Sequence, residues 1–111
     1  MVKLYISGPV SGTEDYEKRF EAAEKRIEKA GYEALNPINV TGFLPSGTRR
    51  ESYMEACIAM LCMCDGIYML KGWEDSPGAN REYGFALGRD MPAFFAGKAL
   101  PDPPKMPETE E

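Results

Sequence analysis

The chain has 111 residues, of which 43% are hydrophobic, and it carries 18 acidic against 13 basic side chains for a net charge of −5. A chain of this length forms one domain, and its apolar content excludes wholesale disorder. The negative charge argues against a nucleic-acid partner, and no apolar run approaches the ~18 residues of a membrane span. Because the first residues show no signal-peptide pattern, we expect a cytoplasmic protein with neither a nucleic-acid nor a membrane partner.

Histidine is absent, which excludes most nucleophilic triads and removes the commonest zinc ligand. The spacing of Cys57, Cys62 and Cys64 matches neither a CxxC pair nor a zinc knuckle. Their apolar surroundings predict buried, reduced thiols. Nucleophilic or acid–base chemistry must then come from carboxylate, tyrosine, serine or lysine side chains, and we expect no metal and no cofactor.

Strand-like and helix-like segments alternate along the chain. The first helix is predicted to begin at Thr13 as its N-cap and to end at Gly31, and residues 38–48 are predicted to be a loop. Strands are expected at 2–7, 32–35, 67–70 and 91–95, and helices at 14–30, 52–64 and 79–88.

This alternation predicts a parallel sheet built from βαβ units, with helices on both faces. A ligand site is then expected beyond the carboxyl ends of the strands. We expect residues 1–99 to form this domain. The remaining residues, 100–111, are acidic and rich in proline, which predicts a disordered tail.

Two loops at that edge of the predicted sheet carry polar or glycine-rich sequence. SGPVSG, at residues 7–12, follows the first strand but matches neither nucleotide-binding fingerprint. It is either a tight turn or a loop whose Gly8 and Gly12 allow backbone amides to approach an anion. In the second loop, Ser76 or Asp75 is predicted to cap the following helix.

Glu82 lies on that helix among small residues, one turn from Gly78, Ala79 and Ala86. A carboxylate on such a closely packed face is costly unless it is paired or serves a site, although a plain surface position is the alternative. Two further residues, Asp65 and Tyr5, each have both a structural and a functional interpretation. Asp65 is either a turn former or a functional carboxylate, and Tyr5 is either a core residue or part of a site.

Three motifs together resemble the nucleoside 2-deoxyribosyltransferase superfamily. They are KLYISGP at residues 3–9, CDGI at 64–67 and SPGANREYGFA at 76–86. The chain is most similar to a small, mostly uncharacterised branch that is often found in phage and prophage genomes. The resemblance implies an α/β fold, a Rossmann-like (flavodoxin-like) three-layer α/β/α sandwich with a short parallel sheet of four to five strands. It also implies a homodimer or a larger homo-oligomer.

The resemblance also implies roles for individual residues. Glu82 matches the catalytic nucleophile, which attacks the anomeric carbon of the sugar. Asp65 matches an aspartate that contacts the sugar or base and helps to protonate the leaving base. Tyr5 matches a tyrosine that orients the nucleophile. The implied substrate-binding residues are Gly8, Pro9, Ser11, Gly12, Ser76 and Gly78.

The leading hypothesis is an enzyme that cleaves or transfers the N-glycosidic bond of a nucleoside or its 5′-monophosphate through a covalent intermediate on Glu82. Ser76, at a predicted helix start, favours the 5′-monophosphate, because superfamily members that act on monophosphates have serine at this position whereas transferases prefer aspartate. One alternative is a nucleotide-binding protein without turnover, with a regulatory or anti-defence role in a phage. Another is a hydrolase that cleaves NAD.

Overall fold

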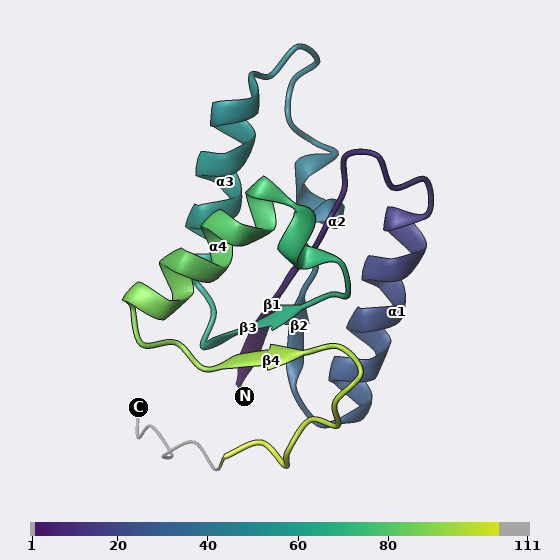
Figure 1. Cartoon of the computed structure of the whole chain (residues 1–111), viewed down its shortest axis with the longest axis vertical. Coiled ribbons are helices and arrows are strands. Elements are labelled where there is room, and N and C mark those ends of the chain that lie inside the picture. Colours follow the sequence, from purple (N-terminus) through teal and green to yellow (C-terminus); the bar gives the residue numbers. More distant parts are fainter. Residues whose placement is uncertain (1, 105–111) are drawn as a thin grey trace, which may run out of the picture.

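The computed structural model describes residues 2–104, and strands and helices alternate along them (Figure 1). The strands are β1 (Lys3–Ser7), β2 (Glu33–Leu35), β3 (Gly66–Met69) and β4 (Ala93–Phe95). The helices are α1 (Tyr16–Lys29), α2 (Ile38–Thr41), α3 (Arg50–Cys62) and α4 (Pro77–Gly88), with a 3₁₀ turn, η1 (Trp73–Asp75), before α4.

The four strands form one parallel sheet in the order β2-β1-β3-β4. In the register of the two central strands, Tyr5 lies opposite Ile67 and Ser7 lies opposite Met69. The expected parallel sheet is therefore confirmed, with four strands in the described part of the chain. The crossover from β1 to its second neighbour, β3, places the carboxyl ends of these two strands side by side.

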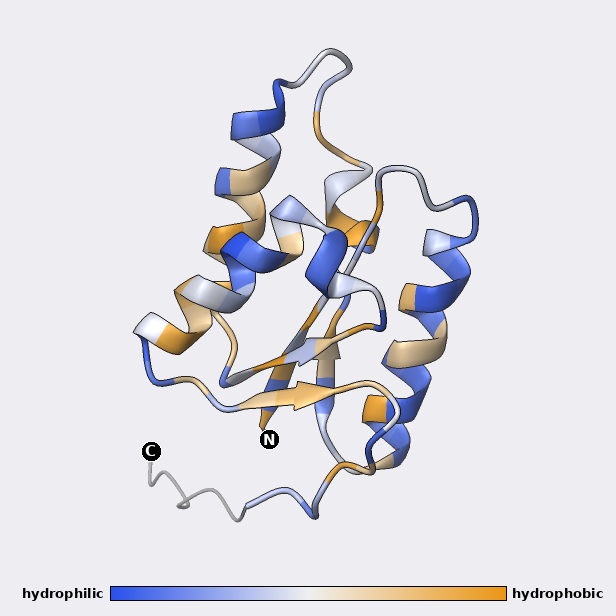
Figure 2. Ribbon diagram, viewed as in Figure 1, coloured by the Kyte–Doolittle hydropathy of each residue, from blue (hydrophilic) through white to orange (hydrophobic). Residues whose placement is uncertain are grey.

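One face of the sheet packs against α1. Leu4 and Ile6 of β1 meet Phe20, Ala23 and Ile27 of the helix, and all five are almost fully buried. The helical spacing of these apolar residues creates one stripe that faces the sheet, and hydrophilic residues cover the outer side of α1 (Figure 2).

The other face packs against α3 and α4. Tyr5 of β1 and Met69 of β3 are buried there with Leu61 of α3 and with Ala79 and Ala86 of α4. The small alanine side chains let α4 approach the sheet closely. With α1 on the opposite face, the result is the expected three-layer α/β/α sandwich.

Helix starts differ from the sequence prediction in an informative way. The N-cap of α1 is Asp15, while the Thr13 N–H donates to the Val10 carbonyl at 3.2 Å, so the loop after β1 closes in a turn before the helix begins. Residues 38–48 include α2, which was predicted as loop. Of the two caps predicted for α4, Ser76 is the N-cap: its hydroxyl accepts the Ala79 N–H at 3.2 Å, and the helix begins at Pro77, two residues before the predicted start.

The described fold continues beyond residue 99. Leu100 packs against the core on the α1 face, and the Tyr32 hydroxyl donates to the Pro101 carbonyl at 2.9 Å. The tail predicted for 100–111 therefore begins with residues that contact the domain, and 105–111 lie outside the described residues. None of the helices within residues 2–104 has the length and apolar character needed to cross a membrane.

The three cysteines differ in exposure, which corrects the prediction that all are buried. Cys64 is buried, Cys57 is half-buried and Cys62 is exposed at the end of α3. Burial raises the pKa of Cys64 to about 11, so this thiol is protonated at neutral pH.

Candidate active site

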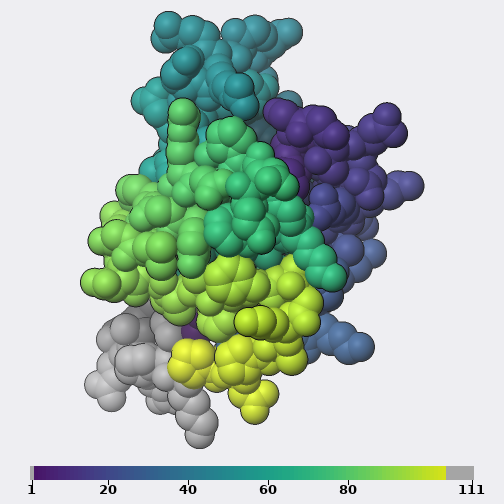
Figure 3. Space-filling view, in the orientation of Figure 1, coloured from purple at the N-terminus to yellow at the C-terminus, as the bar shows by residue number. Residues whose placement is uncertain are grey.

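A cavity of about 1100 Å³ opens at the carboxyl edge of the sheet. Its lining comes from the loop after β1, from α1 and α2, from α3, and from the loop and helix that follow β3. In the space-filling view, the start of α3 and the loop before it stand out from the body of the molecule, beside the loop after β1 (Figure 3). The cavity therefore lies where a parallel α/β sheet ordinarily holds its ligand.

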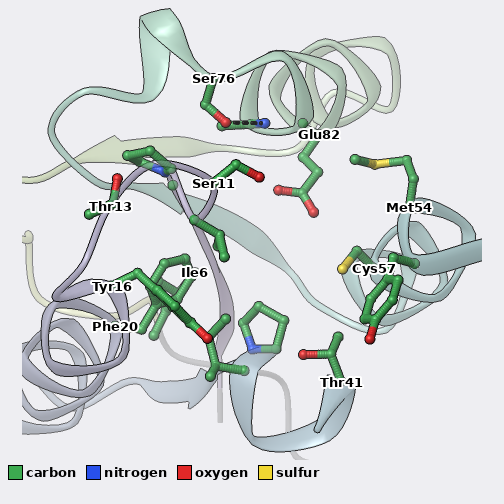
Figure 4. Close-up of a pocket in the computed structure, with 18 of the residues that line it drawn as sticks. Ile6, Ser11, Thr13, Tyr16, Phe20, Thr41, Met54, Cys57, Ser76 and Glu82 are labelled. Atoms are coloured by element: carbon green, nitrogen blue, oxygen red, sulfur yellow. Dashed lines mark hydrogen bonds between the residues drawn. The ribbon is translucent and has the colours of Figure 1, made fainter. Parts of the chain in front are cut away.

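The Glu82 carboxylate points into this cavity from α4 (Figure 4). The Tyr5 hydroxyl donates to Glu82 Oε2 at 2.5 Å, and the Ser7 hydroxyl donates to Oε1 at 2.6 Å. Tyr5 and Ser7 lie two residues apart on β1, so both side chains project from the same face of the sheet towards α4. Each oxygen of the carboxylate thus has one fixed hydrogen-bond donor.

Burial dominates the electrostatics of Glu82, whose side chain is only 6% exposed. Burial raises the pKa of this carboxyl above its usual value, while the hydrogen bonds from Ser7 and Tyr5 pull that pKa down. Burial also raises the pKa of Tyr5 well above its usual value, and the Glu82 carboxylate adds to that rise. Tyr5 therefore remains a hydroxyl donor throughout the neutral range.

Of the residues expected to bind substrate in the loop after β1, Gly8, Pro9 and Ser11 line the cavity, whereas Gly12 does not. Gly12 is exposed in the turn with a φ of 77°, where its role is conformational. Gly8 has a packing role as well, since a side-chain carbon at this position would meet Leu70 Cβ at 2.7 Å. The loop after β1 can therefore lie directly against the end of β3 only with glycine here.

Ser76 and Gly78 also line the cavity, at the start of α4. The Ser76 hydroxyl already accepts the Ala79 N–H as a helix cap. The Asn80 side chain donates to the carbonyls of Trp73, Glu74 and Ser76 at 2.9–3.2 Å, which ties η1 to the first turn of α4. These hydrogen bonds thus fix Ser76 and the start of α4 relative to Glu82, which lies six residues after Ser76 on the same helix.

A family model described as "Domain of unknown function (DUF4406)" matches residues 2–94. The chain belongs to the DUF4406 family. No curated protein matches the sequence.

Among solved structures, the chain is similar to a 2-deoxyribosyltransferase from the psychrotolerant bacterium Bacillus psychrosaccharolyticus. The TM-score is 0.68 at 16% sequence identity, over 90% of this chain and 77% of the other. Both findings fit the resemblance to the nucleoside 2-deoxyribosyltransferase superfamily, and the structural likeness establishes the fold.

The structure of this DUF4406 chain does not bring Asp65 to Glu82. Asp65 is exposed at the amino end of β3, where its Oδ2 accepts the Lys3 N–H at 2.8 Å, and it is not among the cavity-lining residues. The reason is the direction of the strand: Asp65 directly precedes β3, whereas the cavity lies beyond the residues with which the strands end. The expectation that Asp65 contacts a substrate beside Glu82 is therefore wrong for a site formed within one chain.

Two residues of the DUF4406 site escaped the sequence analysis. Ser7 was part of the first motif but received no role, although its place two residues after Tyr5 puts both on one face of the strand. Cys57 of α3 lies in the cavity close to Tyr5 and Glu82 (Figure 4). Burial raises the pKa of Cys57, which keeps its thiol protonated beside the carboxylate.

The remaining walls combine aromatic and charged side chains. Tyr16 and Phe20 of α1 and Tyr53 of α3 supply aromatic surface, while Arg19 and Arg50 supply positive charge. Asp75 also lines the cavity, next to Ser76. Within residues 2–104, no group of three or more histidine, cysteine, aspartate or glutamate side chains is arranged to hold a metal ion.

Proposed function

We propose that this protein cleaves or transfers the N-glycosidic bond of a nucleoside or its 5′-monophosphate through a covalent sugar ester on Glu82. The observation that carries the proposal is the buried Glu82 carboxylate, which faces a cavity of about 1100 Å³ and is oriented by Tyr5 and Ser7. A carboxylate held this way is suited to attack on an anomeric carbon.

The reaction runs in two displacements. One Glu82 oxygen forms a bond to the anomeric carbon, the carbon–nitrogen bond breaks, and its electron pair leaves with the base, which takes up a proton. In the second step water or the ring nitrogen of another base attacks the same carbon. The ester breaks, the carboxylate is released, and the attacking group loses a proton to solvent.

The hydrogen bonds to Glu82 have a direct role in this scheme. By lowering the carboxyl pKa against the effect of burial, Tyr5 and Ser7 keep a larger fraction of Glu82 ionised and able to attack. They also leave the carboxylate a single orientation, so that little freedom is lost when the sugar binds.

The proton for the leaving base does not come from Asp65, which lies at the opposite edge of the sheet. We assign this step to solvent that reaches the base through the open cavity, where Glu17 and Asp75 are the other carboxyl groups among the lining residues. Purine and pyrimidine ring nitrogens accept protons directly, so the reaction does not require a second buried acid.

We further propose a 5′-monophosphate as the substrate. Hydroxyls from Ser11, Thr13 and Ser76 and the guanidinium of Arg19 line the same cavity as Glu82. These groups can donate to phosphate oxygens, and Ser76 stands where a carboxylate would repel them. Thr13 offers only its side chain, because α1 begins later than predicted, after Asp15, and the N-terminus of this helix is therefore not at Thr13.

The decisive experiment offers a panel of deoxyribonucleosides, ribonucleosides and their 5′-monophosphates, with and without a second free base, and follows released or exchanged base by chromatography. The proposal expects base release from a monophosphate by the wild-type protein and none by Glu82→Gln. Asp65→Asn is the matched control, because it removes a carboxylate outside the cavity. A preference for free nucleosides would overturn the phosphate assignment while leaving the Glu82 chemistry intact.

A second candidate is a nucleotide-binding protein without turnover. The observation that favours it is the raised pKa of Glu82 together with the distance of Asp65 from the cavity, which leaves Glu82 without the paired acid of many glycosidases. The same panel separates the two candidates: saturable binding of a nucleotide without any base release identifies the binding protein.

We also propose that the protein forms a homodimer or a larger homo-oligomer. Among the apolar side chains on α3 and directly after it, Tyr53 and Met63 are exposed, whereas Met60 is buried within the fold. Phe43, in the loop before α3, is 89% exposed and adds further apolar area to the surface. Light scattering at micromolar concentration tests the proposal, and a clean monomer would contradict it.

A further inference from the structure

A second cavity, of about 400 Å³, lies on the α1 face of the sheet and is called the basic cleft here. Its floor is apolar: Leu70 follows β3, Ala96 follows β4, and Ala22 comes from α1. Three basic side chains complete the lining: Arg19, Arg26 and Lys71. The cleft is therefore separated from Glu82, which lies on the other face of the sheet, by the ends of the two strands.

The charges of α1 are segregated in a way that builds this cleft. The acidic residues of the helix recur at positions 17, 21, 24 and 28, and the basic residues at 18, 19, 25, 26 and 29. At 3.6 residues per turn the two sets occupy different sides of the helix. Glu24 accepts a hydrogen bond from Asn36 beyond β2, whereas Arg19 and Arg26 face the ends of β3 and β4.

Contacts with the fold hold both arginines in place. Arg19 Nη2 donates to the Lys71 carbonyl at 2.6 Å. Arg26 Nε donates to the Tyr68 hydroxyl at 3.4 Å, with its guanidinium 6.0 Å from the centre of the Tyr68 ring. Since a guanidinium carries five N–H donors, each arginine keeps donors that these contacts do not use.

The cleft concentrates positive charge in a chain whose net charge is −5. No carboxylate occurs among its lining residues, and the ion pairs found within residues 2–104 are Lys3–Glu33 and Lys25–Glu21, neither of which involves the cleft. Bringing three like charges together is unfavourable unless an anion offsets them. Two oriented guanidinium groups and an ammonium suit the oxygens of a phosphate, which arginine binds through paired hydrogen bonds.

We propose that the basic cleft binds a small phosphate-bearing ligand at a site distinct from the Glu82 cavity. Its volume lies near the lower end of the ~300–1,000 Å³ typical of small-molecule sites, so the ligand is compact. The proposal does not depend on the proposed function, because Arg26 and Lys71, the residues that the test replaces, line only the cleft. Arg19 lines both cavities, so it is left unchanged in the test.

The test titrates inorganic pyrophosphate into the ¹⁵N-labelled full-length protein at low salt and follows amide resonances by NMR. Saturable shifts are expected for Lys71 and Gly97, which border the cleft. Lys71→Gln and Arg26→Gln are each expected to weaken binding about tenfold, as loss of one charge-assisted hydrogen bond implies. Lys25→Gln removes the same charge one residue before Arg26 but outside the cleft, and is expected to change binding less than about twofold.

Three results would overturn the proposal: no saturable shift at all, shifts confined to Gly8, Gly78 and Glu82 in the other cavity, or equal weakening by Lys25→Gln. Lys71 is exposed after β3, so its replacement leaves the core intact even if Arg26→Gln reduces stability. Glu82→Gln is expected to bind pyrophosphate like the wild type, which keeps this test separate from the base-release assay.

Discussion

The two edges of the sheet each present a carboxylate, and their surroundings are opposite. At the carboxyl edge, Glu82 is buried, accepts hydrogen bonds from Tyr5 and Ser7, and faces a cavity of about 1100 Å³. At the amino edge, Asp65 is exposed and accepts one backbone hydrogen bond, from Lys3. Two acidic residues singled out by sequence motifs thus have different physical environments.

The difference follows from the direction of the chain. In a parallel sheet every strand ends at the same edge, where loops and helix starts leave room for a ligand, while the other edge carries the turns that enter the strands. At the cavity edge the sheet and helices shield Glu82 from water. Asp65, at the other edge, instead fixes the start of β1 beside the start of β3.

The largest expected effect separates the two carboxylates directly. Glu82→Gln is expected to lower turnover at least about a thousandfold, because the amide cannot form the sugar ester. Base release is measured with the monophosphate panel, and nucleotide binding is measured in parallel to show that the cavity persists. Near wild-type turnover by this variant would exclude the covalent mechanism.

The next effect concerns the two donors to Glu82. Tyr5→Phe and Ser7→Ala are each expected to lower turnover about 10- to 100-fold, the range implied by loss of a hydrogen bond to a charged group. Because both hydrogen bonds lower the Glu82 pKa, their removal should also move the acid limb of the pH–rate profile to higher pH. A lower rate with an unmoved acid limb would show that these hydroxyls do not tune the carboxylate.

A third prediction concerns stability. The pKa of Glu82 is raised in the folded state, so its contribution to stability is present at low pH and is lost as the pH rises through the folded pKa. Glutamine carries no charge at any pH. Glu82→Gln is therefore expected to melt at a higher temperature than the wild type at neutral pH. The difference between the two melting temperatures should shrink as the pH falls towards about 4, near the ordinary glutamate pKa. Thermal melts of both proteins across this pH range measure the difference in melting temperature, and a difference that did not change with pH would contradict the prediction.

The smallest effect is expected at the amino edge. Asp65→Asn retains an oxygen that can accept the Lys3 N–H, so the change in unfolding free energy is expected to be about 1 kcal/mol or less. Turnover should stay within about twofold of the wild type, since surface changes away from a site are small. A large loss of turnover with an unchanged melting temperature would return Asp65 to the catalytic machinery, through a site shared between chains.

Much of the fold could be predicted from the sequence because its signals are local. The apolar spacing of Phe20, Ala23 and Ile27 indicates both α1 and the face that it buries. Ser76 followed by Pro77 marks the start of α4. The start of α1 was placed too early, because Thr13 has the side chain of a helix cap while its backbone N–H is used in a turn to Val10.

The site was only partly predictable, because its geometry depends on pairings between distant elements. Small neighbours on α4 favoured a buried position for Glu82 but left a surface position open, and Tyr5 was found through a motif. Ser7 was missed since a serine at the end of a strand is unremarkable until α4 is placed above it. Asp65 was misplaced because its role was taken from the resemblance, although its position before the predicted strand 67–70 already put it at the amino edge of the sheet.

The side chains of β1 alternate between the two faces of the sheet, and this alternation limits which mutations the strand tolerates. Leu4 and Ile6 point to the α1 face, while Tyr5 and Ser7 point to Glu82, so one strand of five residues contributes to both the apolar layer and the site. Inserting or deleting a single residue within β1 would exchange the two sets, burying hydroxyls under α1 and placing aliphatic chains against the carboxylate. We therefore expect β1 to tolerate no change in length and to accept only substitutions that respect each face.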